Sequence, residues 1–408
     1  MILMEAPLID VPDGAITTPR GFLAGATAAG IRSDTPGRLD LALLLSEQRC
    51  AAAAVYTANR FQAPPLRLTQ RHLADRRAQA VVVNAGCANA LTGGQGRRDA
   101  QEMAELTAAK LGLAVDDVIV ASTGVTGWLL PMERIRGSIG RIVPTEDGGD
   151  AFAHAIMTTD TVAKQAAVQF KWDGVTYAVG GAAKGAGMIH VNMATMLAFL
   201  TTDAPVDGAL LTSLLRETVD ASFNQLTIDN ATSTNDMALL LASGAAGGET
   251  IGGDHPALSL LEAALQQVAT TLTRELARDG EGASKLLEVR VDGAASIEEA
   301  RRAAKTVAGS MLLKAAVFGN DPNWGRVLDA VGYSDVEAEE ERLALAIQAV
   351  EVFRNGEPVP FDQGALSQAL AHGDVHIRID LGAGEATATA WGCDLTPEYV
   401  RINSEYTT

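Results

Sequence analysis

Thr195 is the residue of this chain whose surroundings most clearly suggest chemistry. It ends the glycine-rich stretch Lys184-Gly-Ala-Gly-Met-Ile-His-Val-Asn-Met-Ala-Thr195 and precedes an apolar, strand-like run. A threonine hydroxyl is a weak nucleophile unless a base stands beside it, and the α-amine of the same residue becomes that base once the preceding peptide bond is cut. Cleavage between Ala194 and Thr195 would therefore create a nucleophile. The alternative is a structural role, because β-branched threonine is common in strands.

Five further segments accompany this stretch and lie in a fixed order over nearly the whole chain. They are Ser122–Val125 followed by Leu130–Met132, then Met157–Asp160, Asp279–Lys285, Gly319–Arg326 and Asn403–Thr408. Together with the Thr195 stretch, they resemble the ornithine acetyltransferases (glutamate N-acetyltransferases) of arginine biosynthesis. The resemblance implies a precursor that cuts itself between Ala194 and Thr195 into an α chain, 1–194, and a β chain, 195–408.

The resemblance also implies an activity and an assembly. We expect an acetyl group to move from N2-acetylornithine to glutamate by a ping-pong mechanism through an acetyl-Thr195 intermediate. No metal, nucleotide or organic cofactor is implied, and the two chains would remain together as α₂β₂ or a larger assembly. Some members of the family also accept acetyl-CoA as donor, and the sequence leaves this choice open.

The resemblance assigns two groups of site residues by motif. Thr123 and Gly124 would form the oxyanion hole, through a hydroxyl and a backbone N–H, although a plain strand-to-helix turn also explains the glycine. Lys184 would hold the α-carboxylate of the substrate, and Glu281 would face the side-chain amine of ornithine. Asn403 would supply hydrogen bonds, and the carboxylate of Thr408 a further negative charge. The expected substrate-binding residues are Thr158, Lys184, Thr195, Glu281, Asn403 and Thr408. The alternative for Lys184 is a solvated loop lysine, and for Glu281 a charge beside a helix end. The alternative for Asn403 and Thr408 is a frayed tail.

Other details of these motifs receive no catalytic role. Gly180–Gly187 lacks the order of a nucleotide-binding loop. Gly319–Arg326 is interpreted as a structural turn near the site, and His190 has no assigned part. The chain departs from the family pattern at Val191, where proline is common, at Trp128, where an acidic residue is usual, and at Cys87 within Asn84–Asn89.

The elements that position these residues alternate between strands and helices. Residues 80–84, 118–122, 197–202 and 286–291 are predicted strands, and 165–180 a hairpin around Trp172-Asp173-Gly174. Helices are predicted over 98–113, 210–223, 255–277 and 296–314, and late strands over 375–381 and 386–390. The pattern predicts an α/β protein with mixed sheets. The pattern restarts after Lys285, so we place a boundary near Ser284, between a main domain, 1–284, and a smaller C-terminal α/β domain, 285–408, whose tail is expected to return to the active site. The resemblance implies that the main domain is a four-layer αββα sandwich.

Composition excludes several classes of function. The 408 residues carry 32 Lys plus Arg against 50 Asp plus Glu, a net charge of −18, which disfavours nucleic acid or an anionic membrane as partner. Three separated cysteines indicate neither a disulfide framework nor a zinc site. No signal segment or membrane span is recognisable, so we expect a cytoplasmic protein.

Two rival functions remain open at this point. One is an N-terminal-threonine amidohydrolase or acyltransferase of the same fold in secondary metabolism, which would pass the acyl group to water or to another acceptor. The other is an unprocessed relative that binds acylated amino acids without turnover. The tail Asn403–Thr408, with Lys184 and Glu281, favours amino-acid recognition, and an intact mass measurement separates the unprocessed form.

Overall fold

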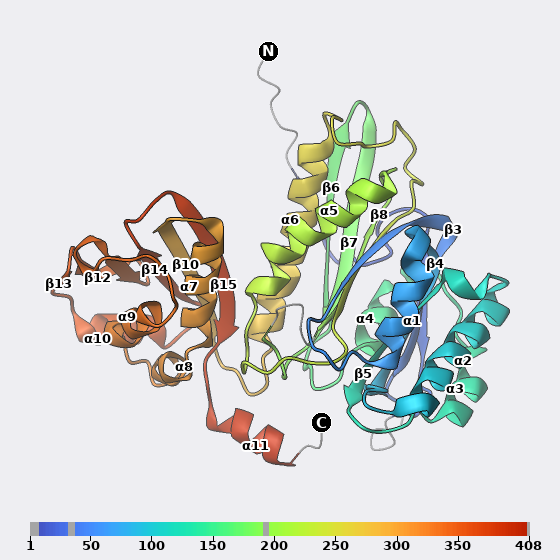
Figure 1. Ribbon diagram of the computed structural model, residues 1–408, viewed down its shortest axis with the longest axis horizontal. Coiled ribbons are helices and arrows are strands. Elements are labelled where there is room, and N and C mark those ends of the chain that lie inside the picture. Colours follow the sequence, from blue (N-terminus) through green and yellow to red (C-terminus); the bar gives the residue numbers. More distant parts are fainter. Residues whose placement is uncertain (1–7, 32–36, 191–195, 406–408) are drawn as a thin grey trace.

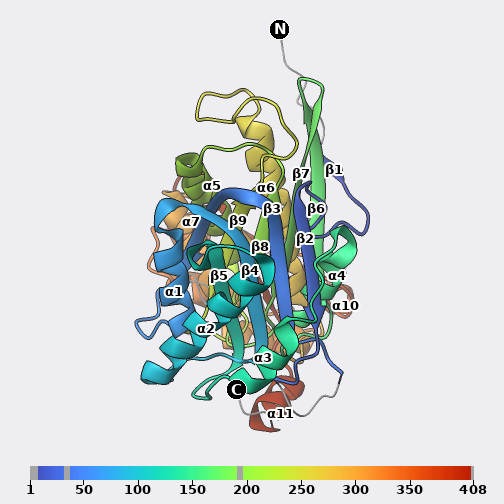
Figure 2. The same ribbon diagram turned by 90° about the vertical axis from the view of Figure 1, so that its right-hand side faces the viewer.

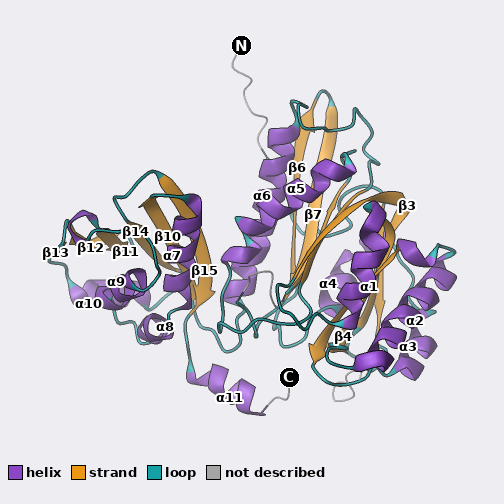
Figure 3. Ribbon diagram, viewed as in Figure 1, coloured by secondary structure: helices purple, strands orange, loops and turns teal. Residues whose placement is uncertain are grey.

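Two β-sheets with helices packed on them make up the protein (Figures 1 and 3). The computed structural model describes residues 8–31, 37–190 and 196–405. Within these ranges, no helix combines the length and the apolar character needed to cross a membrane.

The larger sheet contains nine strands of the described chain. Its path is β1 (Ile9–Asp10), β6 (Lys164–Trp172), β7 (Val175–Lys184), β8 (Leu197–Thr202), β9 (Met237–Ala242), β3 (Leu41–Tyr56), β4 (Arg77–Cys87) and β5 (Val118–Val125), with β2 (Phe22–Thr27) paired to β3. Strands β8 and β9 are parallel, as are β4 and β5, and the other pairs are antiparallel.

The long strand β3 lets this sheet fold back on itself. Its first part, from Leu41 to Leu45, pairs with both β2 and β4, and its last part, from Ala51 to Tyr56, pairs with β9. A register shift separates the two parts. The two halves of the sheet therefore face each other, and alternate side chains from both fill one buried core, among them Val83, Ile119, Phe199 and Leu239.

Helices cover the two outer faces of this double layer. Helices α5 (Gly208–Asp220) and α6 (Leu258–Arg278) pack over β6–β9, and α1 (Pro64–His72), α2 (Gly93–Leu111) and α3 (Met132–Ile139) lie over β4 and β5 (Figures 1 and 2). Helix α4 (Gly149–Ala155) inserts Phe152 into the central core, where its ring meets that of Phe199 edge-on at 5.3 Å. This arrangement confirms the predicted four-layer αββα sandwich.

The second sheet has its own core and its own helices. Its order is β13 (Glu357–Pro358), β12 (Val350–Arg354), β11 (Ala344–Ile347), β14 (Val375–Asp380), β10 (Leu286–Ala294) and β15 (Ala386–Cys393). Strands β10 and β14 are parallel, and the other pairs are antiparallel. Helices α7 (Ile297–Gly309), α8 (Met311–Phe318), α9 (Trp324–Gly332) and α10 (Gln363–Leu370) accompany this sheet.

The two units are joined along α6. Strands β10 and β15 place Leu286, Trp391 and Cys393 in the core beneath α6. The charged rim of this contact includes Arg274 with Glu288 and Arg278 with Asp374, each at 2.7 Å. Helix α11 (Pro397–Glu405) then leaves the second unit and runs below the larger sheet (Figure 1).

One predicted helix is wrong. Residues 296–314 contain the whole of α7 and the first half of α8, because Ser310 between these helices is extended (φ −65°, ψ 110°). The Ser310 hydroxyl accepts a hydrogen bond from Leu313 N at 3.4 Å, as an N-cap does. The apolar spacing continues across the break because Val307 and Leu313 join the same core. Strand β3 is not predicted either, since leucine and alanine, which dominate it, favour helices.

Candidate active site

A cavity of about 160 Å³ lies where β5 and β7 end, beside the turn after α6 and the helix α11. Most of its polar lining comes from motifs that are far apart in the sequence. The lining residues are Ala88, Thr123, Gly124, Thr126, Thr158, Thr159, Lys184, Gly187, Met188, Asp229, Ala231, Ser233, Asn235, Glu281, Tyr399 and Asn403.

The structure brings together six of the residues expected from the sequence. Thr123, Gly124, Thr158, Lys184, Glu281 and Asn403 all line this cavity. The cleavage site Ala194–Thr195, the departure at Val191 and the terminal Thr408 lie outside the described residues. The described chain resumes at Met196, directly before β8, whose first residue Leu197 pairs with Lys184.

Thr123 and Gly124 stand near the end of β5. Gly124 has φ +126°, and a Cβ there would lie 2.3 Å from the carbonyl carbon of Gly86 on the neighbouring β4. Only glycine fits this backbone and this close approach. The Thr123 hydroxyl oxygen accepts a hydrogen bond from Lys184 Nζ at 3.2 Å, so its own hydrogen is available for an oxygen in the cavity. The pair can therefore present two donors, a hydroxyl and a backbone N–H.

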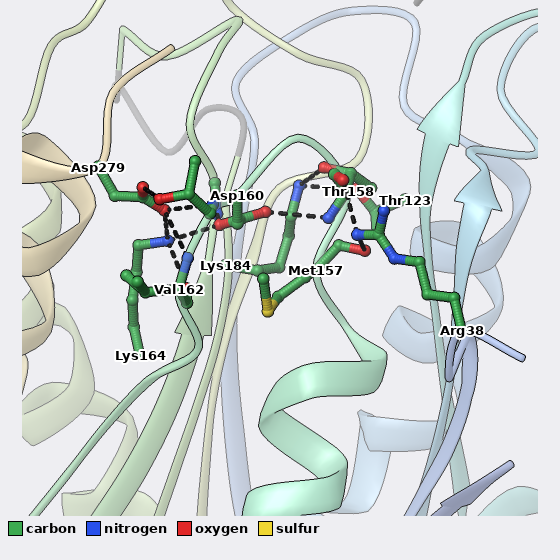
Figure 4. A network of polar contacts seen from close by, with 11 residues as sticks. Arg38, Thr123, Met157, Thr158, Asp160, Val162, Lys164, Lys184 and Asp279 are labelled. Atoms are coloured by element: carbon green, nitrogen blue, oxygen red, sulfur yellow. Dashed lines mark hydrogen bonds and ion pairs between the residues drawn. The ribbon is translucent and has the colours of Figure 1, made fainter. Parts of the chain in front are cut away.

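Lys184 is a buried cation held by hydroxyl groups (Figure 4). Its ammonium donates to Thr158 Oγ1 at 2.7 Å as well as to Thr123, which leaves one of its three N–H groups for a ligand. No carboxylate among the described residues forms an ion pair with it. Burial lowers the pKa of Lys184, and the nearby charge of Asp160 opposes that shift. Lys184 can therefore offer a positive charge to an anionic ligand group.

The backbone of Thr158 is held in turn by Arg38. One guanidinium nitrogen of Arg38, Nη2, donates to the carbonyl oxygens of Met157 at 3.0 Å and Thr158 at 2.7 Å (Figure 4). Thr158 is therefore held at its hydroxyl, which accepts a hydrogen bond from Lys184, and at its main-chain carbonyl.

Glu281 supplies the opposite charge. Its side chain is buried, and its Oε2 accepts a hydrogen bond from Asn403 Nδ2 at 2.8 Å. A Cβ on Gly187 would lie 2.3 Å from the same Oε2, so glycine at this position leaves room for the carboxylate. Opposite charges on Lys184 and Glu281 suit a ligand that carries both an anionic and a cationic group.

Asp229 and Tyr399 complete this side of the cavity and were not predicted. Asp229 accepts hydrogen bonds from the backbone of Met188 at 2.6 Å and of Ile189 at 2.8 Å, and Tyr399 donates its hydroxyl proton to Asp229 at 3.2 Å. Burial, together with the Asp229 charge, raises the pKa of Tyr399, which stays protonated. The polar run 229–236 directly before β9 is the sequence signal that could have revealed this wall.

Three charged residues behind the cavity were also missed. Asp160, Lys164 and Asp279 form a buried ion-paired group next to Lys184 (Figure 4). Asp160 belongs to the Met157–Asp160 motif and Asp279 opens the Asp279–Lys285 motif, but neither motif reveals from the sequence that they share a lysine. A further acid, Asp236, is buried, and its Oδ2 has no hydrogen-bond partner in the described chain. Burial raises the pKa of Asp236 well above its ordinary value.

Two motif segments lie away from the cavity lining. Gly319–Arg326, expected near the site, joins α8 to α9, and its residues from Asp321 to Gly325 line a separate groove with Pro358–Phe361. His190 places Nδ1 3.0 Å from Thr227 Oγ1. Burial and the charge of Lys305 lower the pKa of His190 to about 4, so the ring is neutral near neutral pH.

Comparison with known proteins agrees with the motifs. A family model described as the ArgJ family matches residues 23–408. The arginine biosynthesis bifunctional protein ArgJ of Geobacillus kaustophilus is 49% identical, covering 99% of this chain and 98% of the relative. The protein of that name from Symbiobacterium thermophilum is 51% identical, covering 97% and 99%.

A solved structure agrees as well. The crystal structure of the arginine biosynthesis bifunctional protein from Bacillus halodurans matches with a TM-score of 0.51 and 44% identity. The match covers 52% of this chain and 100% of that chain. The resemblance recognised in the motifs is thus confirmed, and the chain belongs to the ArgJ family.

Proposed function

We propose that this protein transfers an acetyl group from N2-acetylornithine to glutamate through an acetyl ester on Thr195. As a member of the ArgJ family it is an acyltransferase of arginine biosynthesis. The observation that carries the specific proposal is the cavity in which buried Lys184 and buried Glu281 accompany Thr123 and Gly124. Such a site suits an amino acid with a carboxylate at one end and an ammonium group at the other.

The nucleophile would be Thr195 with its own α-amine as base. A free α-amine titrates at about 7.7–8.0, which suits a base near neutral pH. Thr195 Oγ would attack the acetyl carbonyl, and the amine of ornithine would leave with the proton. The amine of glutamate would then attack the ester and restore the hydroxyl. The position of Lys184 opposite Leu197, two residues after Thr195 in the chain, supports this assignment.

Charge on the tetrahedral oxygen would be stabilised by the Thr123 hydroxyl and the Gly124 N–H. Donors of this kind are each worth about 2.7–4 kcal/mol in comparable sites. The free hydrogen of the Thr123 hydroxyl, whose oxygen already accepts from Lys184, supports this role. Lys184 and Thr158 would hold the α-carboxylate that both substrates carry. Glu281, oriented by Asn403, would meet the side-chain ammonium of ornithine, and the terminal Thr408 would also bind substrate.

Cleavage into chains 1–194 and 195–408 belongs to the same proposal. Strand β8 of the second chain pairs with β7 of the first, and β9 pairs with β3, so one continuous sheet would hold the cleaved chains together. The Bacillus halodurans chain, which spans about half of this protein, is of the length expected for one product. We further propose domains 1–284 and 285–408, an α₂β₂ or larger assembly, and a cytoplasmic location.

One mass experiment tests the nucleophile. Purified protein should consist of two fragments, the second beginning Thr195-Met-Leu, whereas Thr195→Ala should remain one chain of 408 residues. Incubation with N2-acetylornithine without glutamate should add one acetyl group to the second fragment, and glutamate should remove it. Efficient cleavage of Thr195→Ala, or an acetyl group on the first fragment, would disprove the assignment.

A further inference from the structure

A buried group of alternating charges continues from Lys184 away from the cavity (Figure 4). Lys164 Nζ donates to Asp160 Oδ1 at 2.8 Å and to Asp279 Oδ2 at 2.6 Å. The side chains of Lys164 and Asp160 are 1% and 0% exposed, and that of Asp279 is 7% exposed. With Lys184, two cations and two anions are thus enclosed together, which is the usual way for a protein to bury charge.

Asp160 fixes the backbone on both sides of the Lys184–Thr158 hydrogen bond. Its Oδ1 also accepts from Gly185 N at 2.7 Å, directly after Lys184, and its Oδ2 accepts from Thr158 N at 2.9 Å. One carboxylate therefore holds the main chain directly after Lys184 and that of Thr158, whose hydroxyl accepts the hydrogen bond from Lys184. The pKa of Asp160 is raised by burial, but the charges of Lys184 and Lys164 more than reverse this and hold the group ionised.

Asp279 connects this group to the other side of the cavity. It is the C-cap residue that follows α6 and lies two positions before Glu281, and it also accepts a hydrogen bond from Thr161 N at 2.9 Å. Glu281 N in turn donates to Ala186 O at 2.8 Å, close to Lys184 in the chain. Lys164 thus joins the segment that carries the cavity cation to the segment that carries the cavity anion.

We propose that Asp160, Lys164 and Asp279 are positioning residues of the acetyl-transfer site. Asp160 keeps Lys184 charged and oriented, and Lys164, through Asp279, sets the position of Glu281 relative to it. None of the three lines the cavity, so each acts through another residue. This inference rests on the proposed role of Lys184 in binding the substrate carboxylate.

Electrostatics gives the proposal a signature that a purely structural role would lack. Burial lowers the pKa of Lys184; Asp160, Asp236 and Glu281 oppose this shift, and the Lys164 charge adds to it. Removing Asp160 should therefore lower the pKa of Lys184, whereas removing the Lys164 charge should raise it. Two neighbouring substitutions should shift the same titration in opposite directions.

The experiment measures the inhibition constant of N-acetylnorvaline, an alternative donor that competes with N2-acetylornithine for the site, against the processed enzyme from pH 6 to 10.5. This compound carries an α-carboxylate, which titrates near 3.5, and no amine, so only the enzyme titrates in this range. The α-amine of Thr195 titrates there too, at about 7.7–8.0, but it is present in the wild type and in both variants, so the step that moves between them belongs to Lys184. Affinity should fall at alkaline pH as Lys184 loses its proton. In Asp160→Asn the fall should begin about one pH unit lower, which is roughly tenfold weaker binding at a fixed alkaline pH. In Lys164→Met the fall should move to higher pH.

If both variants bind N-acetylnorvaline more weakly, but the pH at which binding falls does not move, the proposal is overturned, because only a structural role remains. Lys184→Met tests separately the assumption that Lys184 binds the substrate carboxylate. Unchanged binding of N-acetylnorvaline in Lys184→Met would disprove the role of Lys184 itself. If Lys184→Met loses binding of N-acetylnorvaline while the pH dependence of binding in Asp160→Asn does not shift, only the positioning role of Asp160 is disproved.

Asp279→Asn provides a second measurement should Asp160→Asn not fold. It leaves the Asp160–Lys164 pair in place and weakens the hold on the segment of Glu281. KM for N2-acetylornithine should rise about tenfold, the size of one charge-assisted contact, while the inhibition constant of N-acetylnorvaline should change little. Equal changes for both compounds, or no change in either, would contradict the proposed link to Glu281.

Discussion

Asn403 Nδ2 donates a hydrogen bond to Glu281 Oε2 at 2.8 Å, joining two residues 122 positions apart in the chain. Asn403 belongs to α11, which has left the second sheet and reached the cavity of the first. The same amide donates to Tyr399 O at 3.0 Å within its own helix. The last helix of the chain therefore orients the one carboxylate that we assign to the substrate ammonium.

Replacing this carboxylate should change the choice of donor. Glu281→Gln keeps the shape of the side chain but removes its charge. The kcat/KM for N2-acetylornithine should therefore fall by a factor that corresponds to a free-energy loss of about 1.5–3 kcal/mol. N2-acetylnorvaline, which has no side-chain amine, should lose far less as a donor. Asn403→Ala, which frees the carboxylate but keeps its charge, should give a smaller loss. Equal losses on both donors would mean that Glu281 only organises the site.

The oxyanion role of Thr123 predicts an effect on turnover. Thr123→Ala should lower kcat by roughly 10²–10³ and leave KM for N2-acetylornithine nearly unchanged, because the contact strengthens in the transition state. Steady-state kinetics with Thr123→Ser, which keeps the hydroxyl, and with Ser213→Ala on the exposed side of α5 serve as controls. A raised KM at normal kcat would place Thr123 in ground-state binding instead.

Gly187 should resist even a methyl group. A Cβ there would lie 2.3 Å from Glu281 Oε2, so Gly187→Ala should displace the carboxylate and raise KM for N2-acetylornithine more than for N2-acetylnorvaline. Gly137→Ala in α3, where no atom lies within 4 Å of the new Cβ, is the matched control and should not change KM. If the two alanine variants behave alike, the close packing of Gly187 against Glu281 has no functional part.

His190 should make stability depend on pH. Its pKa falls from the ordinary 6.5 to about 4 in the folded protein, because of burial and the charge of Lys305. Between these values the unfolded chain binds the proton and the folded one does not, so the free energy of unfolding should rise with pH from about 4 to 6.5. His190→Asn should reduce this rise by on the order of 1–2 kcal/mol, allowing for solvent screening of the ring.

Urea titrations of both proteins at pH 4.5 and 7.5 measure this difference. The midpoint of the wild type should drop more on acidification than that of His190→Asn. Parallel changes in the two proteins would show that other groups account for the acid sensitivity.

Phe199 should be among the most costly core residues to truncate. It is fully buried between the two layers of the folded sheet and meets Phe152 edge-on at 5.3 Å. Phe199→Ala should lower the free energy of unfolding by about 3–5 kcal/mol, measured by urea titration. Val143→Ala, at a side chain that is 71% exposed, should change it by less than about 0.5 kcal/mol. A loss similar to that of Val143→Ala would contradict the packing described for Phe199.

Residue type and spacing alone determined much of this protein. Three kinds of signal lie within a few residues of the sequence: a hydroxyl after a glycine-rich turn, a Thr-Gly pair at the end of an apolar run, and continuous apolar runs such as 80–84 and 118–122. Local patterns of this kind predict strands, helices and candidate groups because the interactions that produce them are short in sequence. The family resemblance carried by such short motifs then named Thr123, Lys184, Glu281 and Asn403 before their cavity was seen.

Only the tertiary structure decided which of these groups share a surface, and which are buried. The bend of β3 depends on pairing with β2, β4 and β9, so its leucine and alanine residues do not reveal it. Asp160 and Asp279 meet at Lys164 although they are far apart in the sequence. Their role follows from burial, because charges removed from water must find partners. Both the partners and the burial are created by contacts between distant segments of the chain.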